Sequence, residues 1–293
     1  MEQHLRVFVK VVELGNFSKA AEELHMTQPA VSHYIKVLEE TIGTRLLERS
    51  NKYVRLNKAG EIVYHHAKEI LSLYSRMQDL VDDITNKISG PISIGASYTF
   101  GEYVLPHIIA RLLQQYPEIT PTIQIHNTKE IADLVQTYQL DIGIVEGNLH
   151  GKVHHAEVVS EDNMVIVASG HHPLVKRSGT VSLQELEHET WVLREKGSGT
   201  REAADTLFRD LQLTPEKIME FGSTQIIKES VEAGLGVSLL SIWAIKKELR
   251  NGDMGIIPAN GLPYKRNFTI LRHSSFETKA VQQFIQTLKL YLT

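Results

Sequence analysis

Short polar side chains gather between residues 27 and 36, in the stretch TQPAVSHYIK. The amide of Gln28 can form two hydrogen bonds with adenine, and the hydroxyl of Ser32 can donate to or accept from a base edge. Pro29 offers an apolar surface that suits a thymine methyl group. These residues predict direct reading of base pairs if a helix presents them together in a major groove. Simple capping and surface roles are the alternative.

A basic segment follows and alternates with apolar residues. Residues 45–56 contain four Lys or Arg side chains, and Ser50-Asn51-Lys52 is typical of the tip of a β-hairpin. Arg49 and Lys52 suit contacts with DNA phosphates, which position a protein without reading sequence. A solvated surface hairpin is the alternative.

A second group of polar residues stands where strands are expected to end and helices to begin. Unpaired N–H groups at a helix start favour a carboxylate, sulfate or phosphate group, and hydroxyls add hydrogen bonds without bulk. We therefore expect a small anionic ligand there. The candidate residues are Ser97, Tyr98, Thr99, Thr128, Glu146, Ser198, Gly199, Thr200, Arg201, Thr224 and Gln225.

Two features of this second group leave alternatives open. The stretch 197–201 lacks the Gly-Lys-Ser/Thr ending of a nucleotide-binding loop, and a turn capped by Ser198 or Thr200 needs no ligand. The Glu146 carboxylate would repel a simple anion unless it pairs with Arg201 or recognises an amino group. A zwitterionic or amine-bearing acid is therefore the main competitor to a plain anion.

The sequence offers little for catalysis or metal binding. It has no cysteine, and its three histidine pairs (65–66, 154–155 and 171–172) lack the Asp, Glu or Cys spacing that would complete a metal site. No Gly-x-Ser-x-Gly motif supplies a nucleophile. We expect no metal, no cofactor and no enzymatic activity.

The polar stretch at 27–36 needs a rigid frame, and the surrounding pattern predicts one. Apolar residues at helical spacing predict a helix over 2–14 that Gly15 ends, a short helix over 19–24 that Ser18 caps, and a third helix that Thr27 caps. Three helices of this length with a tight second turn describe a helix-turn-helix head, with the hairpin as a wing.

A long helix is predicted next, capped by Asn57 and ending at about Asn86. Its apolar positions alternate spacings of three and four, which indicates a heptad seam between two chains. The seam comprises Ala59, Val63, His66, Ile70, Leu73, Met77, Leu80 and Ile84, and the last four are expected to be buried in a dimer. A helix packed on its own domain is the alternative.

Ser89-Gly90-Pro91 interrupts that helix, and strands then alternate with helices. Regular alternation predicts a parallel, doubly wound α/β architecture. Strands are expected at 91–97, 122–126, 141–145, 164–168, 191–193, 237–241 and 268–272, and helices at 103–115, 129–139, 183–188, from 200, 225–233 and 277–291.

Five strings in the first sixty residues closely resemble the LysR-type transcriptional regulators. They are FSKAA (17–21), TQPAVS (27–32), IKVLE (35–39), RLLER (45–49) and KAG (58–60). The resemblance implies a sequence-specific DNA-binding regulator whose activity a small molecule modulates. It also implies a periplasmic-binding-protein-like C-terminal domain, with two α/β subdomains around an effector cleft. Crossings between the subdomains are expected near Glu161–Met164 and Asn267–Phe268.

The resemblance and the residue chemistry together assign DNA contacts to the head. Two positions depart from the family pattern: His33 replaces a longer basic or amide side chain, and Asn57 replaces Thr. Asn caps a helix at least as well as Thr. The expected DNA-binding residues are Ser18, Thr27, Gln28, Pro29, Ser32, His33, Lys36, Arg49 and Lys52.

The expected fold class is α/β with an all-α-type winged helix-turn-helix head. A homodimer fits the seam, and the resemblance implies a homotetramer built as a dimer of dimers; either would bind an interrupted inverted repeat in double-stranded DNA. The expected domains are a DNA-binding domain at 1–60, a linker or dimerisation helix at 61–88, and an effector-binding domain at 89–293, divided into subdomain I (89–162 and 268–293) and subdomain II (163–267).

Composition agrees with this organisation. Hydrophobic residues make up 42% of the 293 and charged residues 23%, which is typical of a globular protein. The net charge of −4 divides unevenly, because residues 1–60 hold nine basic and seven acidic side chains and the rest is acidic. The sequence shows no export signal and no membrane-spanning stretch, so a cytoplasmic protein is expected.

Three other classes of protein fit less well. An enzyme would need a convergent acid–base set. A transport-type binding protein would need an export signal and would not have the head at 1–60. A nucleoid protein that binds DNA without sequence preference is opposed by the small basic excess.

Overall fold

The computed structural model describes residues 1–49, 53–82, 88–147, 155–273 and 277–292. Contacts divide the chain into two compact units, Met1–Ile84 and Thr85–Thr293. Within the described ranges, no helix is both long enough and apolar enough to cross a membrane.

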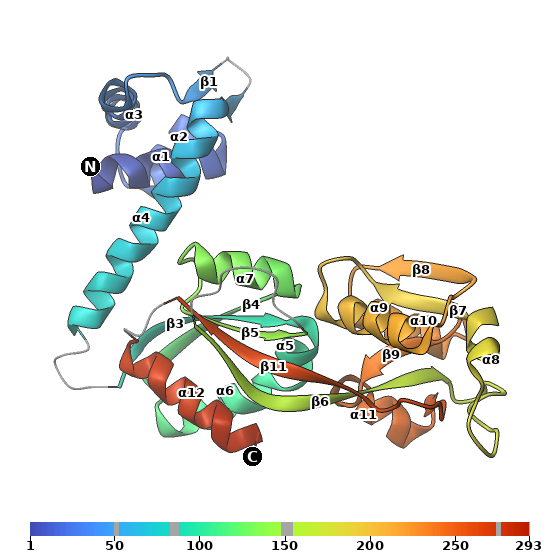
Figure 1. Cartoon of the computed structure of the whole chain (residues 1–293). Helices are drawn as coiled ribbons and strands as arrows, with labels where there is room; N and C mark the ends of the chain where they lie inside the picture. Colours follow the sequence, from blue (N-terminus) through green and yellow to red (C-terminus); the bar gives the residue numbers. More distant parts are fainter. Residues whose placement is uncertain (50–52, 83–87, 148–154, 274–276, 293) are drawn as a thin grey trace. The chain divides into compact units, whose positions relative to one another are not determined.

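The first unit begins with three helices around one core (Figure 1). They are α1 (Glu2–Leu14), α2 (Phe17–Glu23) and α3 (Gln28–Ile42). Gly15 ends α1 in the left-handed conformation, as expected. The core is built from one face of each helix, including Phe8, Ala20, Ile35 and Leu38.

The cap of the second helix was assigned to the wrong residue. The Asn16 side chain accepts hydrogen bonds from the backbone N–H groups of Ser18 and Lys19, at 2.8 and 3.0 Å. Ser18 therefore lies in the first turn of α2, because its own N–H is one of the unpaired donors that a cap satisfies. Thr27 caps α3 as expected, through a hydrogen bond from the N–H of Ala30.

A two-stranded antiparallel wing joins α3 to the next helix. Strands β1 (Leu47–Arg49) and β2 (Val54–Leu56) pair with Leu47 opposite Leu56, and the expected tip at 50–52 lies outside the described residues. Asn57 accepts from the N–H of Gly60 at 2.8 Å and so caps the following helix, as expected. Gly60 is required because a Cβ there would lie 2.0 Å from the carbonyl oxygen of Leu46.

The long helix α4 (Lys58–Asp82) has two apolar faces with different surroundings. Ala59, Val63, Ala67 and Leu71 pack against the core of the winged head, so the first two positions of the expected seam, Ala59 and Val63, contact their own domain. The expected continuation to residue 86 lies largely outside the described residues. A second stripe is exposed in the single chain and comprises Ile62, Ile70, Leu73, Tyr74, Met77 and Val81; we call it the α4 stripe.

The second unit is organised around a mixed seven-stranded sheet (Figure 1). Its strands are β3 (Gly90–Ser97), β4 (Ile119–His126), β5 (Ile142–Glu146), β6 (His155–Ser169), β9 (Ser238–Ser241), β10 (Met254–Ile256) and β11 (Tyr264–Arg272). β3 runs parallel to β4 and β5, but β11 is antiparallel to β5 and β6, and β6 is antiparallel to β9 and β10. The expectation of a wholly parallel sheet is therefore wrong, because β6 leads away from the first three strands and β11 returns beside it.

Helices flank this sheet, and a separate parallel pair, β7 (Thr190–Arg194) and β8 (Lys217–Phe221), lies beyond it. The helices are α5 (Tyr98–Tyr103), α6 (Leu105–Gln115), α7 (Thr128–Gln136), α8 (Leu183–His188), α9 (Gly199–Leu211), α10 (Thr224–Glu232), α11 (Ile242–Asn251) and α12 (Lys279–Leu292). The helix expected over 103–115 is α6, which begins two residues later, with Pro106 in its first turn. Strands β8 and β10 and helices α5 and α11 were not expected.

The long strands β6 and β11 run through both halves of the second unit (Figure 1). At one end Phe268 and Ile270 join a core with Ile94 and Phe284. At the other end Met164 and Tyr264 contribute to a core around Trp191. Between these cores, Asp162 on β6 lies directly opposite Arg266 on β11.

Candidate functional site

Helix α3 presents the predicted base-reading residues on its surface. Gln28, Pro29, His33 and Lys36 are exposed, and Ser32 is half-buried. The Gln28 amide donates to the Ser32 hydroxyl at 2.9 Å, one helical turn away. The two groups therefore lie on one face and orient each other.

A groove separates the C-terminal half of α3 from the wing. Lys36 and Arg45 supply its positive charge, whereas Glu39 is held internally by the N–H groups of Leu46 and Leu47. Arg45 was not among the predicted DNA-binding residues. The groove is lined by Ser32, Lys36, Glu39, Glu40, Gly43, Thr44, Arg45, Leu47, Glu48, Tyr53 and Asn57.

The remaining predicted DNA contacts differ in position. Ser18 is exposed on α2, and the Thr27 hydroxyl is engaged in capping α3. The backbone of Arg49 ends β1, while its side chain and the whole of Lys52 lie outside the described residues.

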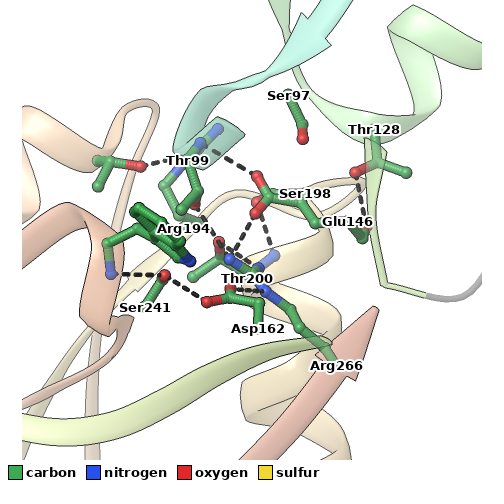
Figure 2. Close-up of polar contacts among 12 residues, drawn as sticks. Ser97, Thr99, Thr128, Glu146, Asp162, Arg194, Ser198, Thr200, Ser241 and Arg266 are labelled. Carbon is green, nitrogen blue, oxygen red and sulfur yellow. Dashed lines mark hydrogen bonds and ion pairs between the residues drawn. The ribbon is translucent and has the colours of Figure 1, made fainter. Parts of the chain in front are cut away.

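In the second unit, a buried arginine gathers several of the predicted ligand-binding residues (Figure 2). Arg266 Nε donates to Asp162 at 2.7 Å, and Nη2 forms an ion pair with Glu146. Nη1 donates to the Thr200 hydroxyl at 3.0 Å, and Nη2 donates to the Thr99 hydroxyl at 3.1 Å. We call these five residues the Arg266 cluster.

The Arg266 cluster is almost completely buried, which sets its electrostatics. Burial raises the pKa of Asp162, and the adjacent Arg266 guanidinium and the Ser241 hydroxyl oppose that shift. Ser241 donates to Asp162 at 2.6 Å. Because two carboxylates face one guanidinium, the cluster holds no excess positive charge.

Glu146 makes two contacts within the protein. Its carboxylate accepts from the N–H of Thr99 at 3.1 Å as well as contacting Arg266. The expected partner Arg201 instead binds Asp205 at 2.9 Å and Glu220 at 2.7 Å. A pairing of Glu146 with Arg201 is therefore wrong.

Close backbone approach joins the strand end at Glu146 to the start of α9. A Cβ at Gly199 would lie 2.0 Å from the carbonyl oxygen of Glu146, so only glycine fits. The same oxygen accepts from the Thr128 hydroxyl at 2.9 Å. Ser198 caps α9 through the N–H of Thr200.

A second arginine lies among the other predicted residues. Arg194, the last residue of β7, donates through Nε and Nη2 to the two carboxylate oxygens of Glu195, both at 2.7 Å. Its Nη1 donates to the Thr224 hydroxyl at 3.2 Å, and the Tyr98 ring centre lies 4.2 Å from its Cζ. Neither Arg194 nor Arg266 nor Asp162 was predicted.

Two predicted residues lie at the margins of these clusters. The Ser97 hydroxyl is buried and donates to the carbonyl oxygen of Ile144 at 3.5 Å. Gln225 accepts from Tyr103 and donates to Glu229. In the part of the chain that the structure describes, no three His, Cys, Asp or Glu side chains are grouped so that they could hold a metal ion.

Comparison with known proteins gives consistent matches along the chain. Residues 3–61 match the family described as bacterial regulatory helix-turn-helix protein, lysR family, and residues 85–292 match the LysR substrate binding domain. The HTH-type transcriptional regulator CysL of Bacillus subtilis is 38% identical over 286 residues, covering 97% of this chain and 95% of CysL.

Solved structures agree with these sequence matches. A full-length variant of OxyR from Pseudomonas aeruginosa is 25% identical with a TM-score of 0.74, covering 100% of this chain and 94% of OxyR. The regulatory domain of Synechocystis PCC6803 CcmR, solved in complex with 2-PG, is 25% identical with a TM-score of 0.64, covering 70% of this chain and 98% of that domain. The chain therefore belongs to the LysR family of bacterial transcriptional regulators, and its second unit is their effector-binding domain.

Proposed function

We propose that this regulator reads an interrupted inverted repeat through α3, acts as a homodimer or homotetramer joined through α4, and responds to a small anionic effector. The proposed division into residues 1–60, 61–88 and 89–293 follows from these roles. The effector would bind where subdomains I (89–162 and 268–293) and II (163–267) meet, and its binding would alter DNA binding or bending.

The observation that supports the effector site best is the orientation of two hydroxyls by Arg266. A guanidinium can only donate, so Thr99 and Thr200 must both accept from it. Each hydroxyl hydrogen then points away from Arg266, and no hydrogen bond donated by either hydroxyl is found among the residues that the structure describes. Thr99 is the second residue of α5 and Thr200 is the second residue of α9, so a ligand oxygen that accepts from both hydroxyls would bridge the two proposed subdomains.

Two further observations bear on the ligand at this site. Glu146 already pairs with Arg266 and accepts from the N–H of Thr99, so an ammonium group on a ligand would compete with a buried guanidinium for this carboxylate. A small pocket whose lining includes Gly147, Lys265, Arg266 and the Glu202 side chain gives a ligand space next to the cluster. The related CcmR domain, solved with 2-PG, supports a small molecule as effector.

Removing the two oriented hydroxyls should weaken effector binding. In full-length T99V/T200V protein, we expect affinity for a bound anion to fall at least about tenfold, because hydrogen bonds to charged groups contribute roughly 1.5–3 kcal/mol each. Calorimetry with a panel of sulfate, phosphate, 2-PG and amino acids measures this. The T99S/T200S protein keeps both hydroxyls and is the matched control; equal affinity in all three proteins would place the effector elsewhere.

Specific DNA reading should depend on Ser32. We expect S32A to reduce preference for the cognate site by roughly 1–3 kcal/mol and to leave non-specific binding nearly intact. The structure adds a reason, because the Ser32 hydroxyl also holds the Gln28 amide in place. Footprinting and titration against cognate and random DNA measure the ratio.

The control for the S32A prediction is a variant that loses a proposed phosphate contact. K52A should weaken binding to every sequence alike and flatten the salt dependence. If S32A and K52A change cognate and random binding identically, the assignment of a reading residue and a positioning residue is wrong. Footprinting with and without the anion panel tests the proposed function as a whole.

A further inference from the structure

We propose that Arg194 is an anion-binding subsite that the Glu195 carboxylate occupies as an internal substitute, and that an anionic effector binds by displacing it. The inference rests on the proposed effector function and specifies how that site is regulated. The ligand class is an anion with two oxygens able to face one guanidinium, namely a carboxylate, sulfate or phosphate group.

The geometry of Arg194 is that of an occupied binding site. Both oxygens of Glu195 face the Nε and Nη2 edge of the guanidinium at 2.7 Å, which is the arrangement that Arg uses to recognise carboxylate and phosphate ligands. Thr224, the first residue of α10, accepts from the remaining Nη1. The guanidinium also lies over the face of the Tyr98 ring, in a cation–π contact.

Glu195 can move away from Arg194, whereas the carboxylates paired with Arg266 cannot leave it. The Glu146 and Asp162 side chains are 2% and 0% exposed, so releasing either would leave a buried charge unpaired. Glu195 is 25% exposed although Arg194 is only 1% exposed. A ligand anion could take the Arg194 edge while the Glu195 carboxylate turns into water and regains its hydration.

The local backbone indicates that the pair is not imposed by the strand. β7 ends at Arg194, and the following turn is closed by a hydrogen bond from the N–H of Ser198 to the carbonyl oxygen of Glu195. Neighbouring side chains on a regular strand point to opposite faces. Glu195 therefore reaches Arg194 only because the chain turns there, and this position can change without disturbing the sheet.

The charges around Arg194 explain why Glu195 would leave when an anion binds. With Glu195 in place, Arg194 and Arg266 contact three carboxylates, those of Glu146, Asp162 and Glu195. Glu102 also interacts electrostatically with Arg194 and Glu146, and Lys228 offsets part of its negative charge. An added anion would be repelled. Moving Glu195 into water removes one negative charge from the site, so anion binding and release of Glu195 are coupled.

The test compares full-length wild type with E195Q, which keeps the shape of residue 195 and removes its charge. Calorimetry at constant ionic strength uses sodium acetate, sulfate and phosphate as probes, with acetamide as the neutral counterpart of acetate. If Arg194 is open in about one molecule in ten, E195Q should bind at least one anion about tenfold more tightly than wild type and should not gain affinity for acetamide. Adding R194Q to E195Q should abolish this gain in anion affinity.

The matched control is E216Q, which removes a carboxylate paired with His188 and should bind the anions as wild type does.

The anion affinities of these variants decide whether Arg194 is the subsite. Equal affinity of wild type and E195Q for every anion overturns the proposal, and so does the absence of binding in both proteins. A gain that persists in R194Q/E195Q, or that E216Q reproduces, also overturns it, because the effect is then general electrostatics. Anion binding that depends on Thr99 and Thr200 but not on Glu195 would leave the proposed function standing. A gain in E195Q without any change in DNA binding would keep the subsite and refute the proposed function.

Discussion

Full-length R266M protein is expected to melt about 6–20 °C below wild type or to fail to accumulate as folded protein. Methionine fills much of the volume of Arg266 but pairs with neither Glu146 nor Asp162, and both carboxylates stay buried. Breaking a buried ion pair costs roughly 3–5 kcal/mol. In a domain of this size each kcal/mol lowers the melting temperature by about 2–4 °C. Calorimetric or circular-dichroism melting measures the effect.

The pH dependence of that loss identifies its cause. Burial already raises the pKa of Asp162 in wild type, and removing the guanidinium removes a group that opposes the rise. A carboxyl whose folded-state pKa is raised destabilises the protein most at a pH above that pKa, and this loss shrinks progressively as the pH falls from the folded-state pKa toward the unfolded-state pKa. The gap between R266M and wild type should therefore be smaller at about pH 5 than at about pH 8.

A matched variant separates lost charge pairing from lost packing. In E146Q/D162N/R266M the orphaned charges are absent, and a substantial part of the melting temperature should return. If the triple variant melts as low as R266M at every pH, unpaired charge is not the reason for the loss.

L73D/M77D protein is expected to be monomeric and to lose cognate DNA affinity by about 100-fold or more. Leu73 and Met77 belong to the exposed α4 stripe, and their spacing is that of a helix–helix seam. Two carboxylates in such a seam would be desolvated without partners. A monomer engages one half-site and loses the gain that comes from tethering two contacts. Light scattering and DNA titration measure both effects.

The control places the same charges on another face of the same helix. Ser72 and Ser75 lie on the side of α4 away from the α4 stripe, so S72D/S75D should remain oligomeric and keep its DNA affinity. If L73D/M77D is as oligomeric as wild type, the α4 stripe is not the interface.

The sequence predicted helix ends correctly where the residues that determine them lie within a few positions of the end. Gly15 and Thr27 mark helix ends because a left-handed residue and a capping hydroxyl act within a few residues. The Ser18 assignment failed because Asn and Ser cap about equally well, and the helix begins at Phe17, which leaves Asn16 at the capping position. Strand β8 escaped prediction because most of its side chains are exposed and no alternating pattern distinguishes it.

The hydroxyls of Thr99 and Thr200 could be predicted from the sequence, whereas Arg266 could not. Thr99, Glu146 and Thr200 were placed together because strand ends and helix starts meet at one edge of an α/β sheet. Arg266 lies 104 positions after Asp162, and only the return of β11 beside β6 brings the two opposite each other. The sequence around it, Lys265-Arg266-Asn267, is polar and typical of a loop, so the strand was expected to begin only at Phe268.

The route of the chain through β6 and β11 has a consequence for biosynthesis. The apolar residues that complete the core beneath β3 include Phe268, Ile270 and Phe284, so this core stays open until almost the whole chain has been made. The winged head has all its core residues by Leu71. At about 5–20 residues per second, translation of the rest takes on the order of 10–40 s. During that interval the winged head can already fold. The apolar strands of the effector-binding domain are still exposed to chaperones and to other nascent chains.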